Sequence, residues 1–264
     1  LAALKRAKQN IEDFHQNQIP QDWFIEKQPG IKYGLKYTPL ESAGLYVPGG
    51  RAPYPSSVLM DAIPAKIAGV GNMVMATPPQ KDGTIAPQIL VAADICGITN
   101  IVKAGGAQAV FALAFGTESV DKVDKIVGPG NIYVTQAKQM VYGRVDIDKP
   151  AGPSEALIYI DDIKYIKFAA AELLSQLEHD PNAQAVGVSS DEQILRAIQK
   201  ELLIQIANCD RQEIIQESAK NSVLFLAKDK EESISIINQV ASEHLVLLSD
   251  DYKTLEPQIK NAEI

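Results

Sequence analysis

Short apolar runs rich in β-branched residues alternate along this chain with segments whose apolar residues recur at the period of a helix. In the first half, a helix at 1–15 is followed by predicted strands at 31–37, 44–47, 73–76, 100–102 and 125–127, and by predicted helices at 56–69, 86–96, 107–115 and 131–142. This β, α, β, α order with short connections is typical of a parallel sheet covered by helices.

A second alternating series follows the turn-rich segment Pro150-Ala-Gly-Pro-Ser154. We predict strands at 155–160, 183–189, 223–227 and 245–248, with helices at 163–178, 192–207, 211–218 and 230–241. We place a domain boundary at 150–154 and a second candidate boundary at the Gly/Pro cluster 48–50. No low-complexity stretch or fixed-period repeat interrupts the pattern, which argues against a solenoid.

The charge balance of the 264 residues limits the partners of the protein. The formal net charge is −8, with 46% hydrophobic and 22% charged residues and no run rich in Lys or Arg. We therefore expect neither a nucleic-acid-binding surface nor a polybasic membrane anchor. No stretch approaches the ~18 apolar residues of a membrane span. Cys96 and Cys209 lie far apart without a CxxC pair, so reduced thiols and a cytoplasmic location are the simplest interpretation.

Two glycine turns follow successive predicted strands of the first series. Gly128-Pro-Gly130-Asn131 begins like a dinucleotide fingerprint, but Tyr133 stands where its third glycine would be, and Gly105-Gly106 precedes Gln108. Both turns would lie at the carboxyl edge of one parallel sheet, where open α/β sheets bind ligands. For Gly128-Pro-Gly130-Asn131, the local sequence alone favours an ordinary strand-to-helix turn with an Asn cap over a ligand site.

Two further clusters combine carboxylate, amide and imidazole groups. Gln176 and His179 are spaced i, i+3 and would share one helix face, so both side chains could meet one zinc ion. Glu243 and His244 are adjacent at a helix–strand junction, where they could supply a general base and a group that activates water. Solvated polar residues at helix ends are the alternative for both clusters. No Gly-x-Ser-x-Gly or P-loop pattern is present.

Six segments of the chain, in order, resemble the signature sequences of the histidinol dehydrogenase family. They are the Gly/Pro-rich segment 44–60 and residues 105–109, 123–131, 151–155, 176–180 and 242–244. Six ordered matches with compatible spacing argue against coincidence. The resemblance implies a two-step oxidation of L-histidinol to L-histidine through the aldehyde, with two NAD⁺ and a zinc ion.

The resemblance also implies a fold. The family has two incomplete Rossmann-like domains with mostly parallel sheets flanked by helices. By this comparison residues 1–45 and 154–264 form a discontinuous first domain that carries the zinc and catalytic motifs, and residues 46–153 form the second, NAD-contacting domain.

Positions that match the family's NAD contacts are Tyr46, Gln108 and Asn131. Ser154 matches a substrate contact. The resemblance thus assigns the two glycine turns to the cofactor and the 150–154 segment to the substrate.

The zinc and catalytic positions are implied in the same way. Gln176 and His179 match two zinc ligands that also border the substrate. His244 matches the general base for each hydride-transfer step, and Glu243 matches the group that activates water to hydrate the aldehyde.

The chain departs from the family pattern at its ends. Family members continue well past the position of Ile264, and that part carries two further zinc ligands, an Asp and a His, and much of a homodimer interface. The start without Met and the uncapped end suggest cuts. Two alternatives stay open: a relative that oxidises another small alcohol such as sulfopropanediol, or, for this chain alone, an inactive NAD-binding fragment with little or no zinc.

Overall fold

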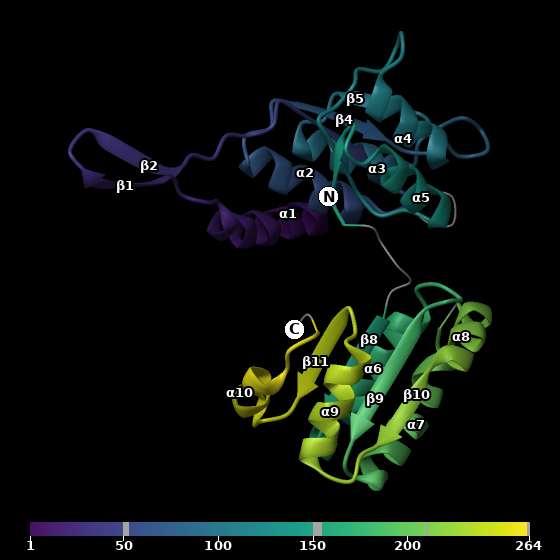
Figure 1. The fold of residues 1–264 in the computed structure, drawn as a ribbon. Coiled ribbons are helices and arrows are strands. Elements are labelled where there is room, and N and C mark those ends of the chain that lie inside the picture. The colour runs from purple at the N-terminus through teal and green to yellow at the C-terminus, as the bar shows by residue number, and fades with distance from the viewer. Residues whose placement is uncertain (50–52, 150–154, 210, 263–264) are drawn as a thin grey trace. The chain divides into compact units, whose positions relative to one another are not determined.

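The computed structural model describes residues 1–49, 53–149, 155–209 and 211–262 (Figure 1). The chain divides into two compact units, Leu1–Ala151 and Gly152–Ile264, and each is described by itself. The division falls in the turn-rich segment at 150–154 that the sequence indicated as a boundary. Each unit is a mixed α/β structure with a parallel sheet flanked by helices, as predicted.

The first unit contains a five-stranded parallel sheet. Its strands and helices are α1 (Ala2–His15), β1 (Trp23–Gln28), β2 (Ile31–Leu35), β3 (Ser42–Tyr46), α2 (Pro55–Ile67), β4 (Asn72–Ala76), α3 (Pro87–Cys96), β5 (Asn100–Val102), α4 (Gly106–Phe115), β6 (Lys125–Val127), α5 (Ile132–Val141) and β7 (Asp146–Ile147). The strand order is β5-β4-β3-β6-β7. This is the order of a doubly wound sheet, in which strands are added first on one side of β3 and then, from β6 on, on its other side.

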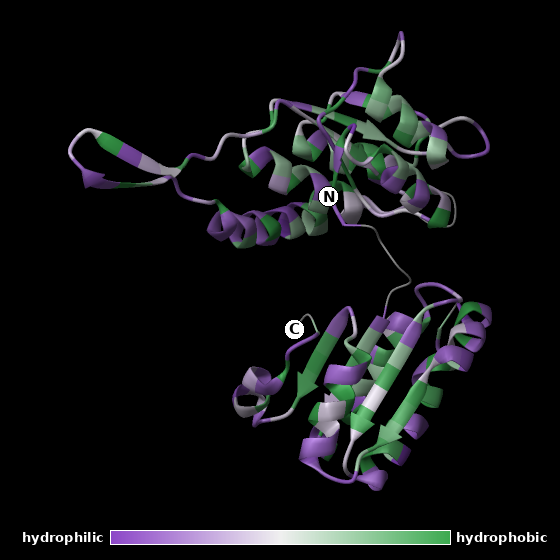
Figure 2. Cartoon of the chain, in the orientation of Figure 1, coloured by the Kyte–Doolittle hydropathy of each residue, from purple (hydrophilic) through white to green (hydrophobic). Residues whose placement is uncertain are grey.

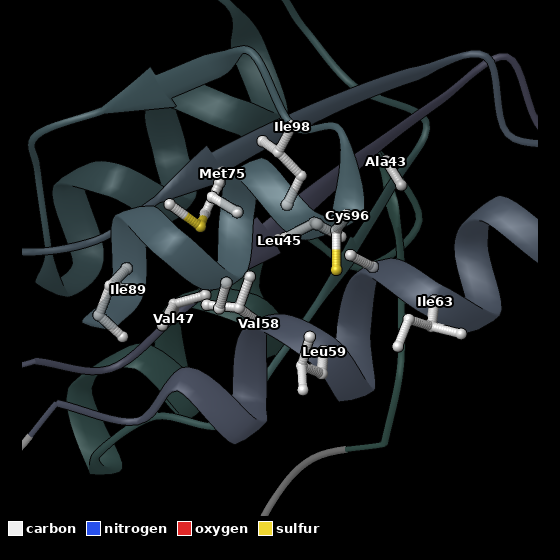
Figure 3. Close-up of a cluster of buried hydrophobic side chains, with 13 residues drawn as sticks. Ala43, Leu45, Val47, Val58, Leu59, Ile63, Met75, Ile89, Cys96 and Ile98 are labelled. Atoms are coloured by element: carbon white, nitrogen blue, oxygen red, sulfur yellow. The ribbon is translucent and has the colours of Figure 1, made fainter. Parts of the chain in front are cut away.

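Alternate residues of β3 face opposite sides of this sheet, as the two-residue period of a strand requires. Leu45 packs with α2 and α3, where Val58, Ile63 and Ile89 are also buried (Figure 3). Tyr46 packs on the other side with α4 and α5. Burying both faces explains why these strands are continuous apolar runs rather than alternating ones.

Residues 1–45 lie in the first unit. Their grouping with residues 154–264 in one discontinuous domain stays a prediction. Helix α1 packs its apolar face, including Leu4, Ala7 and Ile11, against the cluster beneath α2. Strand β3 lies in the middle of the sheet, so the candidate boundary at 48–50 does not separate two units. Between α1 and β3, the antiparallel hairpin β1–β2 is exposed along its whole length.

The second unit contains a four-stranded parallel sheet with the order β10-β9-β8-β11. Its strands and helices are β8 (Glu155–Ile160), α6 (Ile166–Leu177), β9 (Gln184–Ser189), α7 (Glu192–Ile206), α8 (Gln212–Ser218), β10 (Val223–Leu226), α9 (Lys230–Val240), β11 (His244–Leu248) and α10 (Tyr252–Leu255). The order matches the first four strands of a doubly wound sheet.

Both faces of this second sheet are also covered. Residues Ile158 of β8 and Leu173 of α6 belong to the cluster on one face, together with residues of α7 and α8. Leu157 packs on the other face with Ile237 of α9. Figure 2 shows the apolar residues concentrated on the strands and the polar residues on the outer surfaces of the helices.

Most predicted elements are present within two residues of their expected ends. The differences are the strands β1 and β7, the short helix α10 and a 3₁₀ turn at Ile163–Tyr165 that precedes α6. Within the described parts of the chain, no helix combines the length and apolar character needed to cross a membrane.

Candidate active site

The hydroxyl of Tyr46 joins two neighbouring parts of the first sheet's carboxyl edge. Tyr46 ends β3 with its ring buried, and its hydroxyl oxygen accepts a hydrogen bond from the Gly106 N–H at 2.8 Å. Gly106 has a φ of 72°, a value that favours glycine, and it begins α4. Tyr46 therefore holds the glycine turn in place with its polar atom while its ring fills the core.

The Gln108 side chain lies over the same turn. A Cβ atom on Gly106 would lie 3.0 Å from the Gln108 Oε1 atom, so the amide folds back toward the glycine. Gln108 is exposed, unlike its neighbour Ala109. The structure thus brings Tyr46 and Gln108 to one turn, with the Gln108 amide open to a ligand.

The second glycine turn lies after the adjacent strand β6. Asn131 caps α5: its Oδ1 atom accepts hydrogen bonds from the N–H groups of Tyr133 and Val134, each at 3.1 Å. The capping interpretation of this motif is therefore confirmed. Asn131 is exposed, and its Nδ2 group remains a possible donor to a ligand. NAD binding here stays a prediction.

Gly128 brings this turn against the end of β3. Its φ is 118°, and a Cβ atom there would collide with the Tyr46 carbonyl oxygen. Strands β3 and β6 are direct neighbours, with Leu45 paired to Val127. The crevice between the carboxyl ends of these strands is the topological switch point of the sheet, where ligands of such folds bind.

A cavity of about 630 Å³ opens beside the Gly105–Gly106 turn. Its lining includes Gly49, Thr77 and Pro78, which lie after β3 and β4. A Cβ atom on Gly105 would lie 2.6 Å from the Pro78 Cβ atom, so the turn and the cavity wall are in close contact. The cavity has the size of a small-molecule site.

A buried charged cluster behind the Gly128 turn was missed by sequence reasoning. The Lys138 side chain is 4% exposed, donates to the Gly128 carbonyl oxygen at 2.9 Å and forms an ion pair with Asp148. The Gly128 N–H donates to Asp148 Oδ2 at 2.8 Å. Asp61 Oδ2 is buried and has no hydrogen-bond partner among the described residues. Burial, and then the Asp148 charge, raise the pKa of Asp61 to about 8.

The second unit holds the remaining predicted residues. Gln176 and His179 lie at the carboxyl end of α6, where the His179 N–H donates to the Gln176 carbonyl oxygen at 3.2 Å. Gln176 is buried and His179 is exposed. The Gln176 Nε2 atom is buried without a hydrogen-bond partner in the described chain. An unpaired buried amide is costly unless a ligand completes it.

Two side chains from α8 and the residue before it fix this end of α6. The Arg211 guanidinium donates to the Glu178 carbonyl oxygen at 3.0 Å, and the buried Ser218 hydroxyl donates to the Leu177 carbonyl oxygen at 2.6 Å. The last carbonyls of a helix otherwise lack partners. These bonds therefore define the position from which Gln176 and His179 project.

Glu243 and His244 lie at the amino end of β11. His244 Nε2 and Glu243 Oε2 are 4.0 Å apart, with side chains 60% and 31% exposed. The His244 backbone is held by the Ser242 hydroxyl, which donates to its carbonyl oxygen at 2.8 Å. A carboxylate beside an exposed imidazole suits proton transfer with a solvent-accessible substrate.

The predicted substrate contact Ser154 lies outside the described residues. In the described part of the chain, no group of three or more His, Cys, Asp and Glu side chains is placed to hold a metal ion. Gln176 and His179 would supply two ligands, one of them a neutral amide. Zinc sites in proteins use three or four protein ligands, so these two residues fit part of a zinc site and not a complete one.

Comparison with known proteins decides the family. The family model described as histidinol dehydrogenase matches residues 1–264. This chain belongs to the histidinol dehydrogenase family. The histidinol dehydrogenase of Clostridium acetobutylicum is 48% identical over 263 residues, and that of Oceanobacillus iheyensis is 46% identical over the same length.

A solved member of the histidinol dehydrogenase family has the same fold. The crystal structure of histidinol dehydrogenase from Elizabethkingia anophelis matches 99% of the chain with a TM-score of 0.95 and 41% sequence identity. The chain covers 60% of that protein, and 61% and 62% of the two curated relatives. It thus spans about three fifths of the histidinol dehydrogenases it matches.

Proposed function

We propose that the protein containing this chain oxidises L-histidinol to L-histidine through L-histidinal, using two NAD⁺ and a zinc ion, in histidine biosynthesis. The observation that carries the proposal is the Glu243–His244 pair, which combines a carboxylate and an exposed imidazole 4.0 Å apart in a chain of the histidinol dehydrogenase family. A relative at 48% identity is named histidinol dehydrogenase.

His244 acts as the general base in the first step. Its imidazole takes the proton of the substrate hydroxyl, and NAD⁺ held near Tyr46, Gln108 and Asn131 would accept the carbinol hydrogen with its electron pair, which would leave the aldehyde. The exposed position of His244 allows a substrate to reach it and allows the proton to pass on to water.

Glu243 acts on water before the second step. Its carboxylate takes a proton from a water molecule as the oxygen adds to the aldehyde carbon, and the carbonyl oxygen takes up a proton from solvent, which gives the hydrate. His244 then removes a hydroxyl proton from the hydrate, and a second NAD⁺ would accept the hydrogen that leaves the carbon with its electron pair. Glu243 is less exposed than His244, which suits a group that holds one water molecule in a fixed direction.

The first unit binds NAD⁺ at the switch point of its sheet. Tyr46 and Gln108 present the Gly105–Gly106 turn, and Asn131 lies at the adjoining turn before α5. The glycines allow the cofactor to approach the backbone closely, and the positive ends of the helix dipoles at the starts of α4 and α5 favour its phosphates. The adjacent cavity of about 630 Å³ has room for part of the dinucleotide.

Gln176 and His179 hold one side of the zinc ion. The unpaired amide of Gln176 supports this, because exchanging its oxygen and nitrogen positions would present a buried oxygen without a partner. The family resemblance places the other ligands, an Asp and a His, in the part of the protein beyond this chain. When bound, zinc orients the substrate and polarises it, which contributes to rate through positioning.

We propose a homodimer in the cytoplasm, with a small-molecule substrate and with neither nucleic acid nor membrane as a partner. The net charge of −8 and the lack of a basic run support the absence of a nucleic-acid partner. The dimer proposal rests on the family resemblance alone.

NADH formation by the full-length protein tests the substrate assignment. We expect absorbance at the NADH wavelength to rise with L-histidinol and zinc, and to stay at the blank rate with sulfopropanediol. A rise with sulfopropanediol alone would assign the protein to that activity instead. Residues 1–264 tested separately should bind NAD⁺ without turnover, since the zinc ligands are incomplete.

A further inference from the structure

We propose that Lys138 and Asp148 are positioning residues that hold the Gly128–Asn131 turn in the shape that receives NAD⁺. The inference rests on the proposed NAD⁺ site. It assigns a role to an ion pair between the buried Lys138 and the half-buried Asp148, both of which bond to the backbone of Gly128.

The three residues form a closed ring of interactions. The Gly128 N–H donates to Asp148 Oδ2 at 2.8 Å, and the Gly128 carbonyl oxygen accepts from Lys138 Nζ at 2.9 Å. Lys138 and Asp148 close the ring through their ion pair. Both peptide groups that flank Gly128 are therefore fixed, one by an anion and one by a cation.

The ring ties together the two ends of one α/β segment. Lys138 lies in α5, Asp148 follows β7, and the turn between β6 and α5 carries Gly128. Hydrogen bonds to charged groups are stronger than neutral ones, and burial of Lys138 strengthens them further. The orientation of the turn is thus coupled to the position of α5 in the core.

Asp61 makes the packing around the turn tight. Its Oδ2 atom would lie 2.9 Å from a Cβ atom on Gly128, and the Tyr46 carbonyl oxygen would be closer still. Gly128 is therefore confined between Asp61, the end of β3 and the Lys138–Asp148 pair. A turn held from three sides has little freedom to lose when a ligand binds.

The functional consequence follows from preorganisation. Asn131 comes three residues after Gly128, and its Oδ1 atom caps α5. If the turn were mobile, ordering it would subtract from the free energy of NAD⁺ binding. Lys138 and Asp148 remove that cost in advance without touching the cofactor.

The test is Lys138→Met in the full-length protein, with hydrogen exchange and NAD⁺ titration as readouts. Methionine keeps the length and apolar stem of lysine and loses both polar bonds. We expect amide exchange at 128 and 130–131 to speed up about 10-fold or more, and the Kd for NAD⁺ to rise by about 10-fold. The exposed Lys122→Met is the matched control and should change neither quantity.

A double variant covers the case in which Lys138→Met fails to fold. Lys138→Met with Asp148→Asn removes the carboxylate that would otherwise be buried unpaired, and its amide oxygen still accepts from the Gly128 N–H. This variant should fold and still show faster exchange at 130–131 with weaker NAD⁺ binding.

The outcomes separate this inference from the proposed function. A folded variant with wild-type exchange at the turn would overturn the positioning role, whatever its affinity for NAD⁺. Faster exchange with unchanged NAD⁺ affinity would overturn the link between the turn and the cofactor. A wild-type protein that binds no NAD⁺ would overturn the proposed function, while the exchange result would still decide whether Lys138 and Asp148 hold the turn.

Discussion

The Oδ1 atom of Asn131 accepts the N–H of Val134 at 3.1 Å, which fixes the start of α5 at the carboxyl edge of the first sheet. The same oxygen accepts the Tyr133 N–H. The side chain is thus already engaged in the absence of a ligand, with its Nδ2 group left over. The structural and the predicted functional roles of Asn131 are carried by different atoms.

This division leads to a test with Asn131→Asp. Aspartate keeps the capping oxygen, so we expect the thermal midpoint to fall by less than about 2 °C or to rise slightly. It replaces the donor with a negative charge where a phosphate would lie, so the Kd for NAD⁺ should rise by about 10-fold or more. Thermal unfolding measures the stability, and calorimetric titration measures the Kd for NAD⁺. A large fall in thermal stability alongside the weaker NAD⁺ binding would contradict the separation of roles.

Because the pKa of Asp61 is raised, we expect the unfolding free energy of the protein to depend on pH. Its pKa is raised from 3.8 to about 8, first by burial and then by Asp148. The folded state therefore keeps a proton that the unfolded state releases near pH 4. The stability from this proton is fully present below about pH 4 and is lost as the pH rises toward 8.

Replacing Asp61 by Asn removes this loss. We expect Asp61→Asn to have a higher unfolding free energy than wild type. This difference should increase from pH 5 to pH 8 by on the order of 3 kcal/mol. Urea unfolding at several pH values measures it, with the exposed Asp121→Asn as the control. A gain that is the same at every pH would show that Asp61 is ionised throughout.

We expect replacement of Gln176 to have opposite effects on the stability of the protein and on its zinc affinity. Its Nε2 atom is buried without a partner in the described chain, so Gln176→Leu removes an unsatisfied polar group and should leave stability unchanged or raise it by about 1 kcal/mol. In the full-length protein the same change removes a proposed ligand, so zinc affinity should fall by about 10-fold or more. Unaltered zinc affinity in a folded variant would remove Gln176 from the metal site.

His244 should affect turnover far more than cofactor binding. We expect His244→Asn in the full-length protein to lower kcat by about 10²- to 10⁴-fold while the Kd for NAD⁺ stays within about two-fold. The half-buried His15, which lies in α1 of the other unit, provides the control as His15→Asn. Parallel losses in kcat and NAD⁺ affinity would indicate a binding or folding role.

Much of the fold could be predicted because each strand is a short apolar run followed by a turn signal. Glycine at 105 and 128 marked the ends of β5 and β6 correctly, and both turns lie at the carboxyl edge. Strand β7 was missed because two residues are too short to show a period. The predicted division of the chain after residue 45 came from the family resemblance, and strand β3 (Ser42–Tyr46) spans that position in the middle of the first sheet.

The charged cluster was missed for a different reason. Lys138 lies on a helix whose surface also carries polar residues, Asp61 is far from it in sequence, and Asp148 follows it beyond the end of that helix. A single buried lysine has no local signature, because its burial depends on which distant carboxylates the fold brings to it. Gln176 and His179 were found from helical spacing, but the burial of one and the exposure of the other were not predictable from that spacing.

The most direct test of the proposed activity is the ratio of NADH formed to L-histidinol consumed by the full-length protein with zinc. A two-step oxidation to L-histidine through His244 and Glu243 predicts two NADH for each L-histidinol, with L-histidine as the product in equal amount to the substrate used. A ratio of one with the aldehyde accumulating would contradict the role given to Glu243, and no NADH with L-histidinol would contradict the proposed function.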